Sequence, residues 1–227
     1  MPARTLTDYT LHSPKLRRPH TVLVVADLHN APYADILPML AGADLVAVPG
    51  DLAHTLPRQA AQGLAFLREA ARRAPVCYAL GNHEHRCDAA YRARVRETGA
   101  LLLENACQPI GELLVGGVGI APDAAMLADM GAQSAFTLLL CHQPERFFDH
   151  IQPHAIDLTL AGHAHGGQMR VLGRALYAPN QGLLPRWTQG FYAHERLLVS
   201  RGATNSAHPV PRIGVPCEVL RLRLLPA

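Results

Sequence analysis

The stretch "AIDLTLAGHAHGGQ", residues 155–168, joins a short apolar run to two histidines. The run "DLTLA" has the length and the branched apolar content of a buried β-strand. Gly162, His163 and His165 follow directly, so two imidazoles stand one residue apart at the tip of the predicted strand. Histidines tolerated in a loop are one interpretation. The other is a metal site, whose remaining ligands must then come from elsewhere in the chain.

Four more runs of the same kind occur earlier in the chain. They are "TVLVVA" (21–26), "DLVAVP" (44–49), "PVCYAL" (75–80) and "FTLLLC" (136–141). Helices are predicted over 56–73 and over 87–99, where Asp88 is the expected N-cap and Gly99 the expected C-cap. Strand–helix–strand order predicts a layered α/β domain with largely parallel strands. From about residue 168 the pattern changes to antiparallel strands, among them the alternating "EVLRLRL" (218–224).

The composition fits one globular domain spanning residues 1–227. Hydrophobic residues make up 49% of the chain, enough for a sizeable core, and the net charge of +3 is too small to indicate a nucleic-acid partner. The five cysteines contain no CxxC pair, so neither a disulfide framework nor a zinc ribbon is predicted. We therefore expect a reduced, intracellular protein.

Signals for membrane targeting are weak. Residues 1–20 lack the apolar core of a signal peptide, and no run reaches the roughly 18 apolar residues that a membrane span needs. The basic cluster "KLRR" (15–18) is either a solvated turn or a weak contact with anionic lipid. We expect a cytoplasmic protein without a transmembrane segment and with at most a weak peripheral membrane contact.

Oxygen or imidazole donors follow each of the five predicted strands. In chain order they include Asp27, His29, Asp51, Asn82, His83, His142, His163 and His165. Ligands of an open α/β sheet bind beyond the carboxyl ends of its strands, so these side chains should converge although they span residues 27–165. Aspartate, histidine and an asparagine carbonyl suit Mn²⁺, Fe or Zn²⁺ rather than a thiolate site.

The number of donors exceeds what one metal ion needs. A mononuclear site uses three or four, whereas seven of these eight donors, all except His83, match two divalent ions that share one bridging carboxylate. Asp51 is the natural bridge, because "PGD" holds it at a tight turn. Two ions roughly 3.5–4 Å apart can clamp a phosphate and activate a bridging water. The donor set therefore predicts phosphate chemistry.

The blocks D-x-H, GD, GNH, a lone H and GH-x-H, each after a strand, resemble the calcineurin-like metallophosphoesterase superfamily over residues 21–168. The resemblance implies an α/β fold in which a two-sheet β-sandwich is flanked by helices, four layers in all. It also implies a metal-dependent phosphohydrolase in which a hydroxide bridging two ions attacks a phosphodiester or pyrophosphate bond.

The resemblance also assigns roles to the donors. The residues implied for one ion are Asp27, His29, Asp51 and His165. Those implied for the other are Asp51, Asn82, His142 and His163. His83 is not a ligand in this scheme. It faces the phosphate, where it stabilises charge or protonates the leaving oxygen.

The segment "GHAHGGQMRVLG" and the later "YAHERLLVSRG" narrow the resemblance to small bacterial phosphodiesterases, some related to UDP-2,3-diacylglucosamine hydrolases. This implies a small-molecule or lipid-linked phosphate-ester substrate. Many members carry an N-terminal leader or membrane anchor, of which residues 1–20 show no sign. Two alternatives stay open: a catalytically inactive scaffold on the same fold, and a metal-binding protein rich in histidine.

Overall fold

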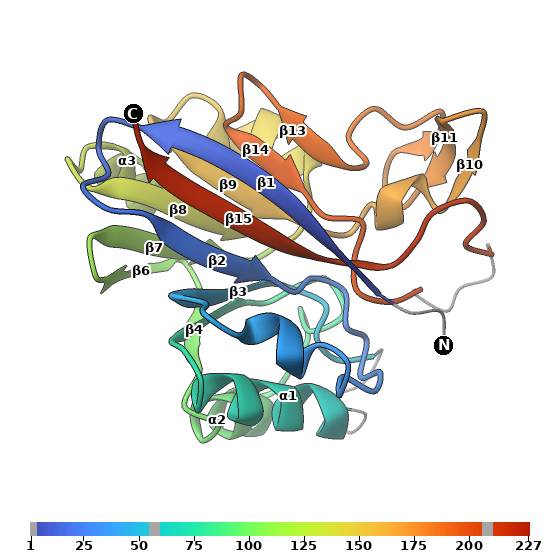
Figure 1. The fold of residues 1–227 in the computed structure, drawn as a ribbon, viewed down its shortest axis with the longest axis horizontal. Coiled ribbons are helices and arrows are strands. Elements are labelled where there is room, and N and C mark those ends of the chain that lie inside the picture. The colour runs from blue at the N-terminus through green and yellow to red at the C-terminus, as the bar shows by residue number, and fades with distance from the viewer. Residues whose placement is uncertain (1–3, 55–59, 206–210) are drawn as a thin grey trace.

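Two six-stranded sheets form the centre of the computed structural model, which describes residues 4–54, 60–205 and 211–227 (Figure 1). The first sheet consists, in spatial order, of β1 (Thr5–Ser13), β15 (Glu218–Pro226), β2 (His20–Val24), β3 (Leu45–Pro49), β4 (Val76–Ala79) and β5 (Leu101–Leu103). The second consists of β13 (Gly190–Tyr192), β14 (Leu197–Val199), β9 (Leu158–Ala161), β8 (Phe136–Cys141), β7 (Leu113–Val118) and β6 (Ala106–Ile110).

Alternation along the strands builds three layers of core. In β2, Val22 and Val24 belong to the cluster between the two sheets, whereas Leu23 belongs to the cluster under the helices. In β8, Leu138 and Leu140 likewise face the first sheet, while Leu139 faces away from it. Because both faces of these central strands are buried, their sequences are continuously apolar.

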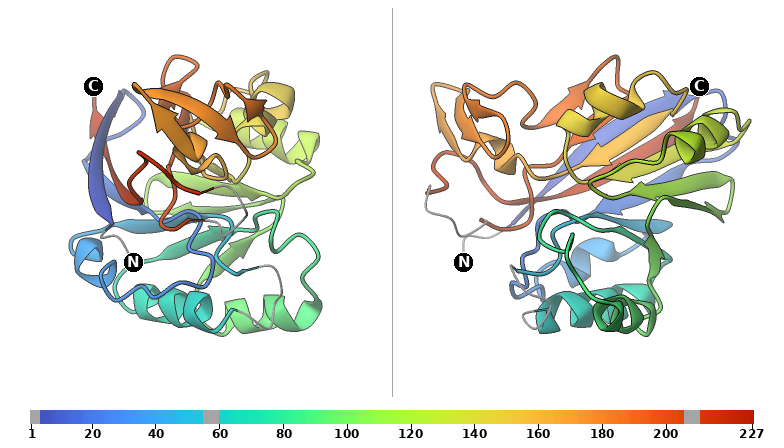
Figure 2. Two further views of the ribbon diagram at one scale, coloured as in Figure 1. Left: turned by 90° about the vertical axis from the view of Figure 1, so that its right-hand side faces the viewer. Right: turned by 180° about the vertical axis from the view of Figure 1, so that it is seen from behind.

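Helices cover the outer face of each sheet. The first sheet is covered by η1 (Leu37–Leu40), α1 (Ala61–Ala71) and α2 (Ala89–Arg96), and the second by α3 (Ala124–Gly131) and the π-helical turn η3 (Phe147–Ile151). Figures 1 and 2 show α1 and α2 on the side of the first sheet that faces away from the second. The order helix, sheet, sheet, helix confirms the predicted α/β sandwich of four layers.

The boundaries of the predicted elements shift by a few residues. Strand β8 spans the predicted 136–141, but β2 ends at Val24, two residues before the predicted end. The first four residues of the predicted helix 56–73 lie outside the described residues, and α1 ends at Ala71. Asp88 is the N-cap of α2, where its side chain accepts a hydrogen bond from the backbone N–H of Tyr91 (2.8 Å). Gly99 is not the C-cap, because α2 ends at Arg96 and Glu97 is its C-cap.

The prediction of antiparallel strands after residue 168 is correct only in part. The strands β10 (Met169–Val171), β11 (Arg174–Ala178) and β12 (Gly182–Leu183) form a separate antiparallel sheet. In contrast, β14 pairs parallel to β9, and β15 lies parallel to β1 and antiparallel to β2. These two strands extend the main sheets and pair with strands far away in the sequence. That residues 1–227 form one domain stays a prediction.

Candidate metal centre

The loops after β2, β3, β4, β8 and β9 meet at one edge of the sandwich and carry the predicted donors. Backbone hydrogen bonds join neighbouring loops: the N–H of Asp27 donates to the carbonyl of Gly50 (3.2 Å) and that of His29 to Asp51 (3.0 Å). In the second sheet, the N–H of Gly162 donates to the carbonyl of His142 (3.0 Å). The side chains are therefore positioned by fixed backbone.

Most of the predicted ligands have a left-handed backbone conformation. Positive φ angles between 46° and 67° occur at Asp27, His29, Asp51, His163 and His165. Such angles are uncommon outside glycine, cost on the order of 1–3 kcal/mol each, and cluster at functional sites. Here they let the chain turn sharply at a strand end and direct a side chain inward.

Two glycines are required by close approach to the carboxylates. A Cβ atom added at Gly81 would lie 2.0 Å from an oxygen of Asp51, and one added at Gly162 would lie 2.5 Å from an oxygen of Asp27. These distances are far below van der Waals contact, so the "GN" and "GH" blocks need glycine for space.

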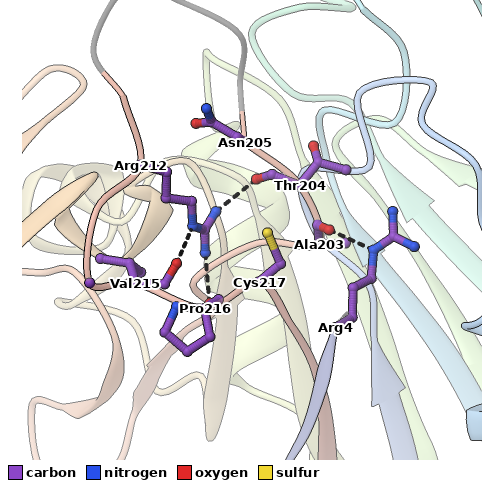
Figure 3. Close-up of a pocket in the computed structure, with 9 residues that line it drawn as sticks. Arg4, Ala203, Thr204, Asn205, Arg212, Val215, Pro216 and Cys217 are labelled. Atoms are coloured by element: carbon purple, nitrogen blue, oxygen red, sulfur yellow. Dashed lines mark hydrogen bonds between the residues drawn. The ribbon is translucent and has the colours of Figure 1, made fainter. Parts of the chain in front are cut away.

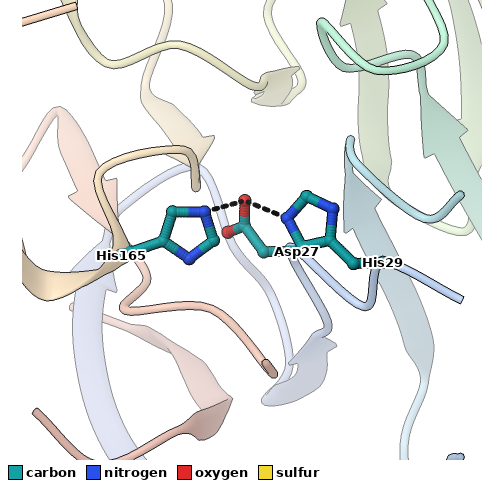
Figure 4. Close-up of side chains that lie close together, drawn as sticks. All are labelled: Asp27, His29 and His165. Atoms are coloured by element: carbon teal, nitrogen blue, oxygen red, sulfur yellow. Dashed lines mark ion pairs between the residues drawn. The ribbon is translucent and has the colours of Figure 1, made fainter. Parts of the chain in front are cut away.

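One group of donors consists of Asp27, His29 and His165. Figure 4 shows both imidazole rings directed at the same Asp27 oxygen, with Nε2 of His165 at 3.6 Å and Nε2 of His29 at 3.8 Å. One donor atom of each residue lies within 4.8 Å of the others, and all three are buried. This spacing fits a single metal ion between them.

A second group consists of Asp51, His142 and His163, again with donor atoms within 4.8 Å of one another. Nε2 of His142 lies 3.0 Å from Oδ2 of Asp51. The same Asp51 oxygen lies 3.9 Å from Nε2 of His29, which belongs to the first group. Asp51 therefore stands between the two groups.

The ring orientation of His142 is fixed from behind. Its Nδ1 lies 2.8 Å from the carbonyl oxygen of Pro49, which can only accept, so the ring proton is on Nδ1. This leaves Nε2 to face Asp51 and the centre. A backbone carbonyl that orients a histidine in this way is typical of metal sites.

Buried donor atoms without a hydrogen-bond partner test whether metal ions fit. Among the described residues, such atoms include Nδ1 and Nε2 of His29, Oδ1 of Asn82, Nε2 of His163 and Nδ1 of His165. Buried polar atoms are rarely left unpaired, and their clustering at one point needs an explanation. Divalent ions supply it, because every one of these atoms is a metal-ligand type.

Burial sets the protonation of three of these rings. It lowers the pKa of His29 to about 3 and that of His165 to about 4, and it holds the pKa of His163 well below its usual range. These rings are neutral at pH 7, as metal ligands must be. Burial also acts to lower the pKa of His142, but the Asp51 carboxylate raises it to about 10. A metal ion bound there must displace a proton.

His83 lies at the mouth of the centre. Its side chain is 23% exposed, its Nε2 lies 3.7 Å from Oδ2 of Asp51, and it lines an open pocket together with Asn82, His85 and Arg86. Its donor atoms are also within 4.8 Å of those of His29 and Asp51. The geometry is therefore compatible with both a substrate-facing ring and an additional ligand.

Glu84, which follows the same predicted strand end as Asn82 and His83, is a buried support of the centre rather than a solvated side chain. Its carboxylate accepts hydrogen bonds from the backbone N–H groups of Asp51 (3.1 Å), Ala53 (2.7 Å) and Gly81 (2.8 Å). These bonds tie the loop after β3 to the loop after β4. Burial, together with the nearby Asp51 charge, raises the pKa of Glu84 to about 7. The block "GNHE" is the only sequence signal for it.

A separate pocket of about 720 Å³ is lined in part by Arg4, Thr204 and Arg212 (Figure 3). Arg212 donates to the backbone carbonyls of Thr204 (2.7 Å) and Val215 (2.8 Å). Thr204 in turn donates through its hydroxyl to the carbonyl of Asp27 (2.9 Å). Arg212 is thus a positioning residue, which no motif in the sequence indicates.

Comparisons with known proteins agree with this geometry. Residues 20–167 match the family model described as calcineurin-like phosphoesterase. An uncharacterized metallophosphoesterase of Helicobacter pylori is 29% identical over 196 residues, which cover 81% of this chain and 51% of that protein. One of Campylobacter jejuni is 28% identical over 234 residues, 93% of this chain and 60% of that protein. The chain thus spans about half the length of the H. pylori relative.

Among solved structures, the NAD nucleotidase of Haemophilus influenzae superposes with a TM-score of 0.50 at 13% identity. The match covers 65% of this chain and 38% of that one, and at this identity it supports the fold alone. Within the described residues, no helix combines the length and the apolar character needed to cross a bilayer.

Proposed function

The chain belongs to the calcineurin-like phosphoesterase family, and on this premise we propose that it hydrolyses phosphodiester or pyrophosphate bonds with two divalent metal ions. Members of the family are metal-dependent phosphoesterases. One observation carries the dinuclear proposal: two groups of buried donors meet at Asp51.

In this proposal the donors divide between two ions as follows. Asp27, His29 and His165 hold the first ion, and Asn82, His142 and His163 hold the second, with Asp51 shared. Two bound ions neutralise the charge on phosphoryl oxygens and activate water at neutral pH. Mn²⁺, Fe and Zn²⁺ all accept this mixture of carboxylate, imidazole and amide ligands.

The chain's own contribution to the chemical step centres on His83. Its ring is a partly exposed imidazole beside the buried donors, and it lines the open pocket through which a phosphate would reach them. In its protonated form the ring stabilises charge on the phosphoryl oxygens and donates a proton to the leaving oxygen. The backbone N–H of His83 also donates to Oδ1 of Asp51 (3.0 Å), which fixes its place relative to the bridge.

Our preference for diester and pyrophosphate bonds over monoesters rests on the resemblance of the segments after residue 162. The substrate is proposed to be a small-molecule or lipid-linked phosphate ester. A cytoplasmic location with a weak peripheral membrane contact also stays a prediction, which cell fractionation checks.

The test is turnover by metal-stripped protein reloaded with Mn²⁺, Fe²⁺ or Zn²⁺. An aryl phosphodiester, an aryl phosphomonoester and a nucleotide pyrophosphate are compared at equal concentration. We expect hydrolysis with at least one metal, and faster hydrolysis of the diester or the pyrophosphate. A protein that binds two ions and turns over none of the three is an inactive scaffold. Faster hydrolysis of the monoester contradicts the proposed bond preference.

A further inference from the structure

Exposed apolar side chains gather on the small β10–β11–β12 sheet and at Ile213, which lies next to it. Six large hydrophobic side chains are exposed among the described residues, and five of them lie there: Val171 (54%), Leu172 (99%), Leu183 (80%), Leu184 (71%) and Ile213 (54%). Monomeric soluble proteins rarely concentrate apolar surface in this way without an interaction. We name Val171, Leu172, Leu183 and Leu184 the apolar tip.

Neither folding nor packing explains the apolar tip. Leu172 and Gly173 connect β10 to β11 with positive φ angles of 47° and 78°, a turn that favours asparagine or glycine at both positions. A leucine placed there gains no burial and bears backbone strain. Because β12 runs antiparallel to β11, Leu184 lies beside Leu176, on the way back towards this turn.

The charge around the apolar tip is positive and unpaired. From residue 169 to residue 190 the sequence has three arginines and no acidic residue. Arg170, Arg174 and Arg186 line one groove together with Leu184. In the described parts of the chain, no ion pair joins any of these three arginines to a carboxylate. The guanidinium of Arg170 already donates to the backbone carbonyls of Gly166 and Gly173. Arg174 and Arg186 are therefore the two arginines here whose preferred partner is an anion from outside the chain, such as a phosphate.

We propose that the small sheet docks the protein on an anionic lipid bilayer. The apolar tip inserts at the level of the acyl chains, and Arg174 and Arg186 bind lipid phosphates. Apolar side chains flanked by cations are the signature of interfacial membrane binding. Figures 1 and 2 show the β10–β11 hairpin projecting at one end of the molecule, away from α1 and α2, as docking requires.

The docking surface adjoins the metal centre. β10 begins four residues after His165, and β11 packs so closely that a Cβ added at Gly167 would lie 2.3 Å from the Cβ of Ala175. Docking through this sheet therefore places the loop that carries His163 and His165 next to the lipid surface. The inference does not depend on the identity of the substrate.

The basic cluster "KLRR" offers a competing membrane contact and a matched control. Lys15 forms an ion pair with Asp157 (2.9 Å), and the backbone N–H groups of Arg17 and Arg18 donate to the carboxylate of Glu112 (3.3 Å). Acidic side chains thus accompany this cluster, in contrast to the apolar tip. Arg17→Ala with Arg18→Ala removes two arginines, as many as Arg174→Ala with Arg186→Ala.

The experiment is flotation of the full chain with vesicles of phosphatidylcholine, with and without phosphatidylglycerol, at low and high salt. We expect salt-sensitive binding to the anionic vesicles only. Leu172→Asp with Leu184→Asp should weaken it on the order of 100-fold. Arg174→Ala with Arg186→Ala should weaken it about 25-fold, because each arginine near an anionic surface contributes about fivefold.

Three results would overturn the proposal. They are wild-type protein that does not float with anionic vesicles, a leucine variant that binds as tightly as wild type, and loss of binding in Arg17→Ala with Arg18→Ala. The side chains replaced in the leucine variant and in the Arg174 and Arg186 variant are exposed, so neither change should disturb the fold. Melting temperatures equal to that of the wild type check that both variants are folded.

Discussion

The metal centre and the apolar tip are built in opposite ways. The centre takes buried side chains from five strand ends, and backbone hydrogen bonds and the Glu84 carboxylate hold its loops together. The apolar tip belongs to three short strands outside the two main sheets, with leucines in solvent. Metal ligands need precise placement, and here they extend from the rigid core of the protein. The proposed contact with an external partner uses an added small sheet, where sequence changes disturb the core less.

The largest expected effect follows from replacing Asp51, the donor that both groups share. Asp51→Ala should remove the residue shared by both groups, so both ions are lost and turnover falls on the order of 10³-fold or more. His29→Ala is the control and should weaken mainly one site. Metal content per chain, measured by elemental analysis, checks this. Equal single-site losses in the two variants would show that Asp51 is not the bridge.

The next effect separates the chemical step from metal binding. His83→Ala should keep both ions and lower turnover of an aryl diester about 10²–10⁴-fold, because the acid–base partner of the leaving oxygen is lost. The loss should shrink for substrates with better leaving groups, which need less protonation. A variant that loses an ion identifies His83 as a ligand. Full activity with a poor leaving group excludes the acid role.

A pair of glycine substitutions sharpens the contrast between the two regions. Gly81→Ala places a methyl group 2.0 Å from an oxygen of Asp51, so the carboxylate must move, and metal affinity should fall at least about tenfold. Gly173→Ala, at φ +78° with open space around its Cβ, should cost only about 1 kcal/mol of stability and leave metal affinity unchanged. Isothermal titration and thermal melts measure both. Equal metal affinity in the two variants contradicts the contrast.

The last prediction concerns the metal-free protein, whose stability should depend on pH. The folded pKa values of His29, His163 and His165 lie below 6.5, so the unfolded chain binds more protons in acid. Each ring contributes stability that is present above about pH 6.5 and is lost as pH falls, by at most about 1.4 kcal/mol per pH unit. Glu84, with its pKa raised to about 7, acts in the opposite direction for one proton between about pH 7 and 4.5.

His142, with its pKa raised to about 10, contributes stability that is lost mainly above pH 6.5, so it changes little between pH 6.5 and 5. The balance of the three neutral rings against the Glu84 carboxyl therefore predicts a lower melting temperature at pH 5 than at pH 6.5. His165→Gln should flatten this dependence. A melting temperature that rises as the pH falls from 6.5 to 5 contradicts the assignment of neutral rings.

Much of the centre can be predicted from sequence because its donors follow continuously apolar runs. Asp27, Asp51 and His142 each come within three residues of the end of a strand that is buried on both faces, and parallel strands bring their carboxyl ends to one edge. The glycines of "GN" and "GH" directly precede donors in the sequence and are visible there. The carboxylates for which they leave space, Asp51 and Asp27, belong to other loops, so the reason for glycine is seen only in the structure.

Other features depend on contacts between residues far apart in the chain. The hydrogen bonds from Arg212 to Thr204 and from Thr204 to Asp27 join segments that no motif links. The alternating pattern of β15 does not determine that it pairs with β1, because the same pattern suits parallel and antiparallel neighbours. The pairing is set when distant strands assemble into one sheet. The apolar tip cannot be predicted from the sequence pattern, because a short strand with exposed leucines has the same apolar sequence as a short buried strand.

Metal stoichiometry tests the central claim most directly. Metal-stripped protein is titrated with Mn²⁺ or Zn²⁺, and bound metal per chain is measured by calorimetry and confirmed by elemental analysis after gel filtration. Two groups of donors joined at Asp51 predict saturation at two equivalents per chain. Saturation at one equivalent, with both metals, contradicts the dinuclear centre.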